Sequence, residues 1–198
     1  MDVEFIKSKF IKNSGILKTS ELSKFNVSSR NIKKLISDGV IEKIRFGYYR
    51  LVDNEDESEI GVISRLFPDS VICMCSALFY YGYSDRTPLQ WDICINKNAF
   101  KKRFDIDYPL IKPYFVTSDK LSYGVTNVNI DGCLVKIFDR DRLICECLKS
   151  ESKMDNEVFN KAIHNYISDP QKNIDNLIKY CEKRKATKKM QNILGVWL

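Results

Sequence analysis

The residues in this chain whose types and spacing could do chemistry are basic side chains gathered in one short segment. Arginine and lysine hold phosphates or read guanine edges in DNA, and neighbouring hydroxyls donate or accept hydrogen bonds. Between residues 14 and 52 these types occupy one helical pattern and the hairpin pattern that follows it. The predicted DNA-contacting residues are Ser29, Arg30, Lys33, Lys34, Ser37, Lys43, Arg45 and Arg50.

The elements that must position these side chains form the pattern of a winged helix-turn-helix. A helix is expected over 2–13, before this segment. Thr19 is expected to cap a short helix at 20–25 and Ser28 a second helix at 29–38, because a hydroxyl can accept an orphan amide at a helix start.

The second of these helices has one apolar face and one basic face. Ile32, Leu35 and Ile36 share the apolar face, so the basic residues point the other way. Gly39 stands where a left-handed residue ends a helix, and strands are expected at 40–44 and 48–52, with Gly47 at the turn. Such a unit places its second helix in a major groove and its hairpin along the backbone. A solvated charged face, or a protein-interaction module, would produce a similar pattern.

The net charge supports the DNA hypothesis through its location. The chain has a net charge of +6. Residues 1–52 hold 11 Lys/Arg and 5 Asp/Glu, while 53–198 hold 21 of each. All the excess positive charge therefore lies in the segment predicted to bind DNA, as expected if phosphate contacts drive affinity through counterion release.

Three parts are predicted along the chain: a winged helix-turn-helix at 1–52, an acidic linker at 53–59, and a C-terminal domain at 60–198. Helices are expected at 60–67, at 77–81 opened by Ser76, at 140–148 capped by Asp139, and at 156–167, 174–185 and 188–198. Strands are expected at 71–73, 91–95, 111–116, 125–130 and 133–138, the last two joined by the hairpin signal Asp131-Gly132. Residues 96–109 receive no assignment. The predicted fold class is α+β, with an N-terminal winged helix-turn-helix and a mixed C-terminal domain of antiparallel strands and a helical C-terminal half.

A second group of basic residues lies near the C-terminus. A solvated helix face explains such a run as well as a second electrostatic surface for DNA or RNA does. The six residues are Lys179, Lys183, Arg184, Lys185, Lys188 and Lys189.

The patterns that would indicate an enzyme or a metal centre are weak. Cys145 and Cys147 lie two residues apart on a helix and face different directions, so they cannot share a metal. His164 is the only histidine and has no nucleophile motif around it. Asp139, Asp141 and Glu146 could indicate a metal-dependent nuclease, although helix capping and ion pairing explain them as well. We predict no enzymatic activity, no catalytic residue, no metal and no cofactor.

Neither a secretory signal peptide nor a membrane span is expected. Its first residues lack a basic start and an apolar run, and no stretch approaches the ~20 apolar residues that span a bilayer. Seven cysteines without a secretory signal are typical of reduced thiols, so a cytoplasmic location is expected, with no membrane partner.

Several of these motifs, in this order, resemble the AbiEi antitoxin family of bacterial abortive-infection operons. The resemblance covers nearly the whole chain. It begins at Gly15-Ile16 and the wing Gly47-Tyr48-Tyr49-Arg50-Leu51, and continues through Ser76-Ala77-Leu78, Gly82, Asp85 and Pro88. It is clearest at residues 136–146, Lys-Ile-Phe-Asp-Arg-Asp-Arg-Leu-Ile-Cys-Glu, and it extends over the helix pair at 155–181. Asp141, Leu143 and Glu146 depart from the family's usual Glu, Thr and Asp.

The resemblance implies a phage-defence antitoxin of a type IV toxin–antitoxin system. Its winged helix would repress the operon by binding inverted repeats in promoter DNA. Its C-terminal domain would counteract a nucleotidyltransferase-like toxin without needing a tight complex with it. The alternatives are a transcription factor whose second domain senses a ligand or dimerises, and a DNA-directed nuclease.

Overall fold

The structure is a computed structural model that describes residues 2–52 and 58–195. The chain forms two compact units, one of residues 1–68, 100–109 and 129–134, and one of residues 69–99, 110–128 and 135–198. The fold is α+β, and the predicted fold class is confirmed. The boundary predicted at 53–59 lies mostly outside the described residues and stays a prediction.

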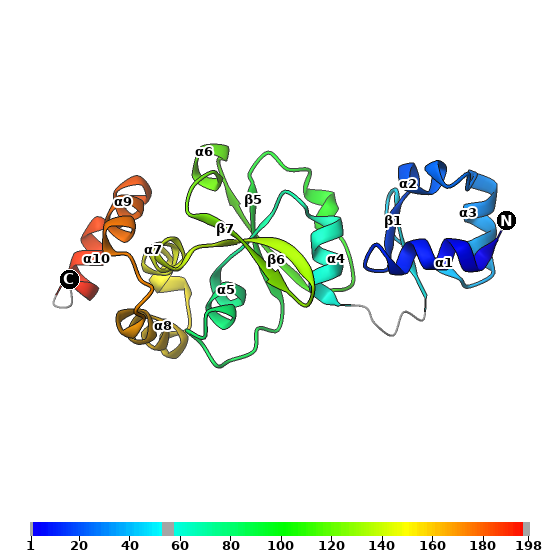
Figure 1. Ribbon diagram of the computed structural model, residues 1–198. Helices are drawn as coiled ribbons and strands as arrows, with labels where there is room; N and C mark the ends of the chain where they lie inside the picture. Colours follow the sequence, from blue (N-terminus) through cyan, green and yellow to red (C-terminus); the bar gives the residue numbers. More distant parts are fainter. Residues whose placement is uncertain (1, 53–57, 196–198) are drawn as a thin grey trace. The chain divides into compact units, whose positions relative to one another are not determined.

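The first unit contains a winged helix-turn-helix (Figure 1). Its three short strands form one antiparallel sheet in the order β1-β3-β2, so the strand before the helix-turn-helix pairs with the second strand of the wing. The elements are α1 (Val3–Ile11), β1 (Ile16–Lys18), α2 (Thr19–Lys24), α3 (Ser29–Ser37), β2 (Ile41–Arg45), β3 (Tyr48–Leu51), α4 (Glu59–Leu66) and the 3-10 helix η1 (Lys101–Phe104).

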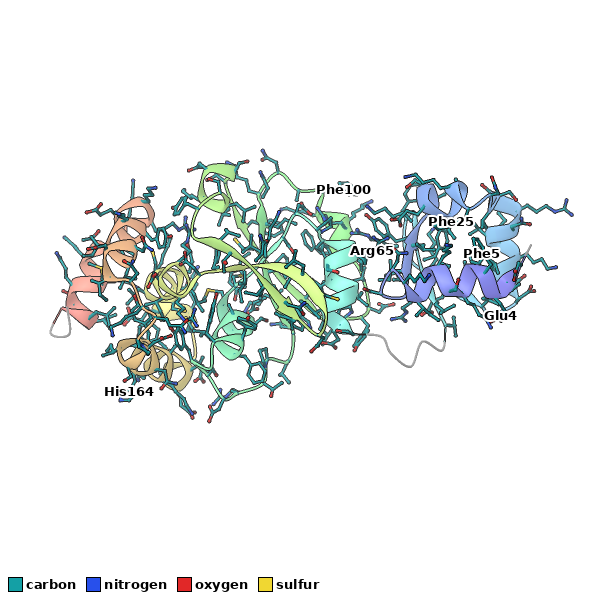
Figure 2. All side chains as sticks on the ribbon, viewed as in Figure 1. Glu4, Phe5, Phe25, Arg65, Phe100 and His164 are labelled. Atoms are coloured by element: carbon teal, nitrogen blue, oxygen red, sulfur yellow. The ribbon has the colours of Figure 1, made fainter. Side chains whose placement is uncertain are left out.

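An apolar core holds α1, α2 and α3 against the small sheet. It is built from buried side chains spaced three or four residues apart on two of the helices, Ile6 and Phe10 on α1 and Ile32 and Leu35 on α3, together with Leu22 of α2. Phe5 and Phe25 lie edge to face beside this core, with ring centroids 6.3 Å apart (Figure 2). Ile36, predicted to share the buried face, is 39% exposed.

Two local details of the first unit differ from the sequence prediction. Thr19 is not the cap of α2: the helix begins at Thr19 itself, and the Glu21 carboxylate accepts the backbone N–H of Lys18 at 2.8 Å. The Thr19 hydroxyl instead donates to the Gly47 carbonyl in the wing. The strand β1 was not predicted, because three residues are too short to show an alternating pattern.

Most of a five-stranded sheet, in the order β6-β5-β4-β8-β7, lies in the second unit, while residues 129–134 of the β7–β8 hairpin are grouped with the first unit. β4 pairs with β5 antiparallel, whereas β4 pairs with β8 and β5 with β6 in parallel, so the sheet is mixed where the sequence predicted antiparallel strands. Its strands are β4 (Val71–Ile72), β5 (Trp91–Asn96), β6 (Ile111–Val116), β7 (Val125–Ile130) and β8 (Cys133–Phe138). Its helices are α5 (Met74–Tyr80), α6 (Ser118–Leu121), α7 (Arg140–Ser150), η2 (Glu151–Lys153), α8 (Asn156–Ser168), α9 (Ile174–Arg184) and α10 (Thr187–Leu194).

Helix α7 is the centre of the second unit. Every residue from Asp141 to Leu148 is buried, including charged ones, because α5, α8, α9 and α10 all pack against this helix (Figure 1). A helix buried on all sides shows no amphipathic stripe, so the sequence alone did not reveal its central place.

The helix caps and the hairpin turn that the sequence predicted are correct where the hydrogen-bond partner lies within a few residues. The Asp139 carboxylate caps α7 by accepting the N–H of Arg142 at 2.7 Å, as predicted. Asp131 and Gly132 both have positive φ, as the predicted tight hairpin requires. Ser76 does not open α5, which begins at Met74: the Asp92 carboxylate accepts the N–H of Cys75 at 2.9 Å. The cap of this helix therefore comes from β5 and not from a neighbouring residue.

Candidate nucleic-acid interface and a buried charge cluster

Helix α3 is held by its cap and its apolar face. The Ser28 hydroxyl accepts the N–H of Asn31 at 3.3 Å, as predicted, and Gly39 takes the left-handed conformation just past the helix end. Ile32 and Leu35 are buried in the core. The rotation of the helix is therefore fixed, and its opposite face is turned to solvent.

The outward face of α3 carries the predicted contact residues. Ser29, Arg30, Lys33, Lys34 and Ser37 are all exposed. The Ser37 hydroxyl donates to the Lys34 carbonyl at 2.8 Å, which leaves its oxygen as an acceptor. α3 contains no acidic residue. This surface is positively charged, and its side chains are of the types that contact phosphates and guanine edges in DNA.

Ser28 gives a direct test of how α3 is held. Ser28→Ala removes the accepted hydrogen bond at the helix start and is expected to lower the unfolding free energy of the first unit by about 1 kcal/mol. The matched control is Ser20→Ala, an exposed serine inside α2, which should change stability far less. Urea unfolding followed by circular dichroism measures both. Equal losses in the two variants would show that the Ser28 cap does not hold α3.

The wing carries the remaining predicted residues, and they have different environments. Lys43 is exposed, and its Nζ atom lies 5.7 Å from the ring centroid of Phe46. Phe46 stands at the tip of the wing and is 92% exposed. Sequence reasoning did not select Phe46, although an aromatic residue directly before the turn glycine was the available signal.

Arg45 has an internal role in the first unit. Its Nη1 and Nη2 atoms donate to the carbonyls of Arg103 and Leu66, at 2.9 and 2.7 Å. Its guanidinium also lies 4.1 Å from the ring centroid of Tyr48. The sequence placed Arg45 on the wing surface, whereas the structure turns it toward η1 and the end of α4. Residues 96–109, which contain Arg103, had received no sequence assignment.

Arg50 lies across the wing from Glu42. Its Nε atom donates to the Glu42 carboxylate at 2.7 Å, and the two residues are register partners on β3 and β2. An ion pair across a strand pair neutralises the charge that was predicted to contact DNA. The predicted residues are therefore brought together on α3, while Arg45 and Arg50 on the wing are engaged within the protein.

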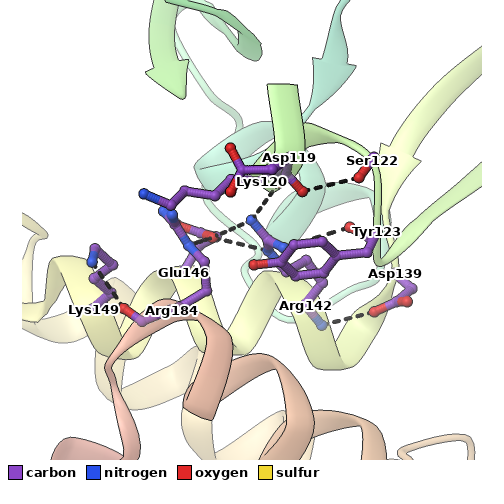
Figure 3. Close-up of polar contacts among 9 residues, drawn as sticks. All are labelled: Asp119, Lys120, Ser122, Tyr123, Asp139, Arg142, Glu146, Lys149 and Arg184. Carbon is purple, nitrogen blue, oxygen red and sulfur yellow. Dashed lines mark hydrogen bonds and ion pairs between the residues drawn. The ribbon is translucent and has the colours of Figure 1, made fainter. Parts of the chain in front are cut away.

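The second unit contains a buried cluster of charges around Glu146 (Figure 3). The Glu146 carboxylate accepts from Arg142 Nε at 2.9 Å, from Arg184 Nε at 2.6 Å and from Arg184 Nη2 at 2.8 Å. Arg142 also donates to the carbonyls of Lys120 and Tyr123. Arg142 is fully buried and Arg184 is 6% exposed. Two arginines thus share one carboxylate inside the protein.

The C-terminal basic run does not act as one surface. Arg184, one of its six members, is buried against Glu146, because α9 turns this residue toward α7. Lys189 pairs with Glu151 at 3.1 Å, and Lys183 lies over the ring of Tyr123. The members exposed to solvent are Lys179, Lys183, Lys185 and Lys188.

The acids of the nuclease hypothesis serve structural roles. Asp139 caps α7 and also accepts from the Tyr180 hydroxyl at 2.9 Å. Asp141 accepts from the Tyr166 hydroxyl and from the N–H of Asn173, both at 2.8 Å. Burial raises the pKa of the Asp141 carboxyl despite these bonds. In residues 2–52 and 58–195, no three or more His, Cys, Asp or Glu side chains are grouped as they would be to hold a metal ion.

Most of the cysteines are buried, whereas the histidine is exposed. All seven cysteines are free, and five of them are buried. Burial, together with the nearby Asp92, raises the pKa of the half-buried Cys75 thiol to about 11, so this thiol is protonated at neutral pH. His164 is exposed on α8 (Figure 2).

No model of a protein family matches this chain, and no match was found among curated proteins. Within the described parts of the chain, every helix is too short or too polar to cross a membrane.

Proposed function

We propose that this protein is an autoregulatory antitoxin that binds double-stranded promoter DNA through the outward face of α3. The observation that carries the DNA-binding half is the exposed row of Arg30, Lys33 and Lys34 on a helix whose rotation is fixed by Ile32 and Leu35. The sheet order β1-β3-β2 gives this helix the setting of a recognition helix in a winged helix-turn-helix.

The antitoxin half of the proposal is supported by the resemblance to the AbiEi family. The residues that carry the resemblance most clearly, 136–146, form the end of β8, the Asp139 cap and the buried first turns of α7. In this proposal the protein binds inverted repeats upstream of its own gene and counteracts a nucleotidyltransferase-like toxin without forming a tight complex. Its location would be the cytoplasm.

A gel-shift titration of the purified chain against its own upstream region tests the DNA-binding half. At two salt concentrations, the proposal expects a sequence-specific shift that weakens steeply as salt increases, because phosphate contacts release counterions. A shuffled duplex of the same length is the control. Equal binding to both duplexes by the folded protein would overturn specific promoter recognition and favour a protein-interaction role for the winged helix.

A co-expression experiment tests the antitoxin half separately. If the neighbouring gene encodes a toxin, its expression should arrest growth, and this chain should restore growth. Restored growth with a variant that cannot bind DNA would support the proposal that DNA binding and toxin counteraction belong to different parts of the chain. Arrest that persists with the folded protein present would overturn the antitoxin assignment.

A second candidate function is a transcription factor whose second unit senses a ligand. The observation that favours it is a cavity in the second unit that is lined by buried Arg184 and by Lys149.

A further inference from the structure

The second unit contains a cavity of about 140 Å³ between its sheet and the helices α7 and α9. The polar part of its wall is formed by Tyr114, Glu146, Lys149, Ser150 and Arg184. The rest of the wall is apolar and includes the buried thiols of Cys73 and Cys94. At about 30 Å³ for each water in the liquid, this volume holds a molecule of only a few non-hydrogen atoms.

The charges at this cavity do not balance. Glu146 contributes a negative charge to the cavity wall, and Lys149 and Arg184 contribute two positive charges. Arg142 does not line the cavity, but it also donates to the Glu146 carboxylate. A further carboxylate, Asp92, acts electrostatically on the wall residues Cys73 and Tyr114, but it accepts the N–H of Cys75 and does not line the cavity. With Asp92 counted, the three positive charges of Arg142, Lys149 and Arg184 are set against the two negative charges of Glu146 and Asp92. One excess positive charge therefore remains. Arg142 and Arg184 are buried, where an unbalanced charge is costly, whereas Lys149 is exposed and its charge is partly screened by solvent.

The donors of the wall have capacity left for a ligand. Both oxygens of Glu146 are occupied by arginines, while the Arg184 fork uses Nε and Nη2 for that carboxylate. Among the described residues, Nη1 of Arg184 has no hydrogen-bond acceptor. The Lys149 ammonium uses one of its three donors on the Arg184 carbonyl at 3.0 Å. Burial and the charge of Asp92 raise the pKa of Tyr114, so its hydroxyl remains a donor at neutral pH.

We propose that this cavity binds a small anion, either a carboxylate or a phosphate of a few non-hydrogen atoms, held by Arg184, Lys149 and the hydroxyls of Ser150 and Tyr114. A guanidinium and an ammonium that converge on one anion form charge-assisted hydrogen bonds, which are stronger than neutral ones. The volume suits a small ion better than a nucleotide, because pockets for drug-sized ligands are about 300–1,000 Å³. This inference goes beyond DNA binding, stands independently of the antitoxin proposal, and names the ligand class that the second candidate function would need.

Titration of the full chain with inorganic phosphate tests the site, using ³¹P NMR line broadening and thermal unfolding at constant ionic strength. Chloride is the reference anion, and acetate in a parallel series distinguishes a carboxylate site from a phosphate site. The expected result is a saturable rise in Tm with one of the two anions, because a ligand that binds only the folded state stabilises it. No saturable effect of either anion would overturn the proposal.

The matched variants are Lys149→Met and Lys188→Met. Both remove one exposed lysine charge from the second unit, but only Lys149 lines the cavity. Lys149→Met should weaken anion binding about tenfold or more, which is the effect of losing a hydrogen bond to a charged group. Lys188→Met should keep the affinity. Equal weakening in both would indicate general electrostatic attraction and overturn the site, and Ser150→Ala gives a second lining variant if Lys149→Met does not fold.

Discussion

Replacing Arg30, Lys33 and Lys34 together by alanine is expected to lower the affinity for the upstream DNA by at least about 100-fold, since each specific contact is worth roughly 1–3 kcal/mol. All three side chains are exposed on α3. Alanine is a good helix former, so the helix should remain intact. The dependence of affinity on salt should also become shallower, by about 0.9 in the logarithmic slope for each phosphate that the variant no longer neutralises.

The control for this variant carries the same change in charge elsewhere. Lys97, Lys136 and Lys153 are exposed and belong to the second unit. Their combined replacement by alanine should leave the slope and the affinity nearly unchanged. Fluorescence anisotropy with the labelled upstream duplex measures both triple variants. If the two variants lose affinity equally, the attraction comes from the overall charge and α3 is not the recognition helix.

Glu146→Ala is expected to destabilise the second unit by about 3–5 kcal/mol, the usual effect of removing one partner from a buried ion pair. Glu146 accepts from both Arg142 and Arg184, and all three residues are less than one-tenth exposed. Without Glu146, two guanidinium groups would face each other inside the protein with no carboxylate between them. Urea unfolding, monitored for the change in midpoint at unchanged m-value, measures the loss.

The matched control is Glu157→Ala. Glu157 also accepts from an arginine, Arg86, at 2.8 Å, but its side chain is 77% exposed. Water and salt screen such a pair, so its removal should leave stability nearly unchanged. A double variant, Glu146→Ala with Arg184→Met, should lose less than the sum of the two single variants, because the second change removes one of the stranded charges. Additive losses would show that Glu146 and Arg184 do not depend on each other.

Signals that act within a few residues were predicted correctly from the sequence. Ser28 and Asp139 cap the helices that follow them, and Gly39 and the Asp131-Gly132 hairpin adopt the conformations their types favour. The partner of each is a backbone group three residues away or its own backbone, so local chemistry is sufficient.

The same local reasoning failed where the partner comes from another element. Thr19 had the residue type of a cap, but its hydroxyl donates to the Gly47 carbonyl in the wing, and Glu21 accepts the N–H at the start of α2 instead. Arg45 had the position of a wing contact but donates to the carbonyls of Leu66 and Arg103.

The sequence by itself determined that the excess positive charge gathers in residues 1–52 and that α3 has one apolar and one basic face. Only the tertiary structure decided which cations remain at the surface. Arg184 belongs to a basic run in the sequence, yet it is buried against Glu146, 38 residues earlier in the chain. The physical reason is that helical spacing fixes which side chains share a face, whereas burial and charge pairing depend on which distant elements pack against that face.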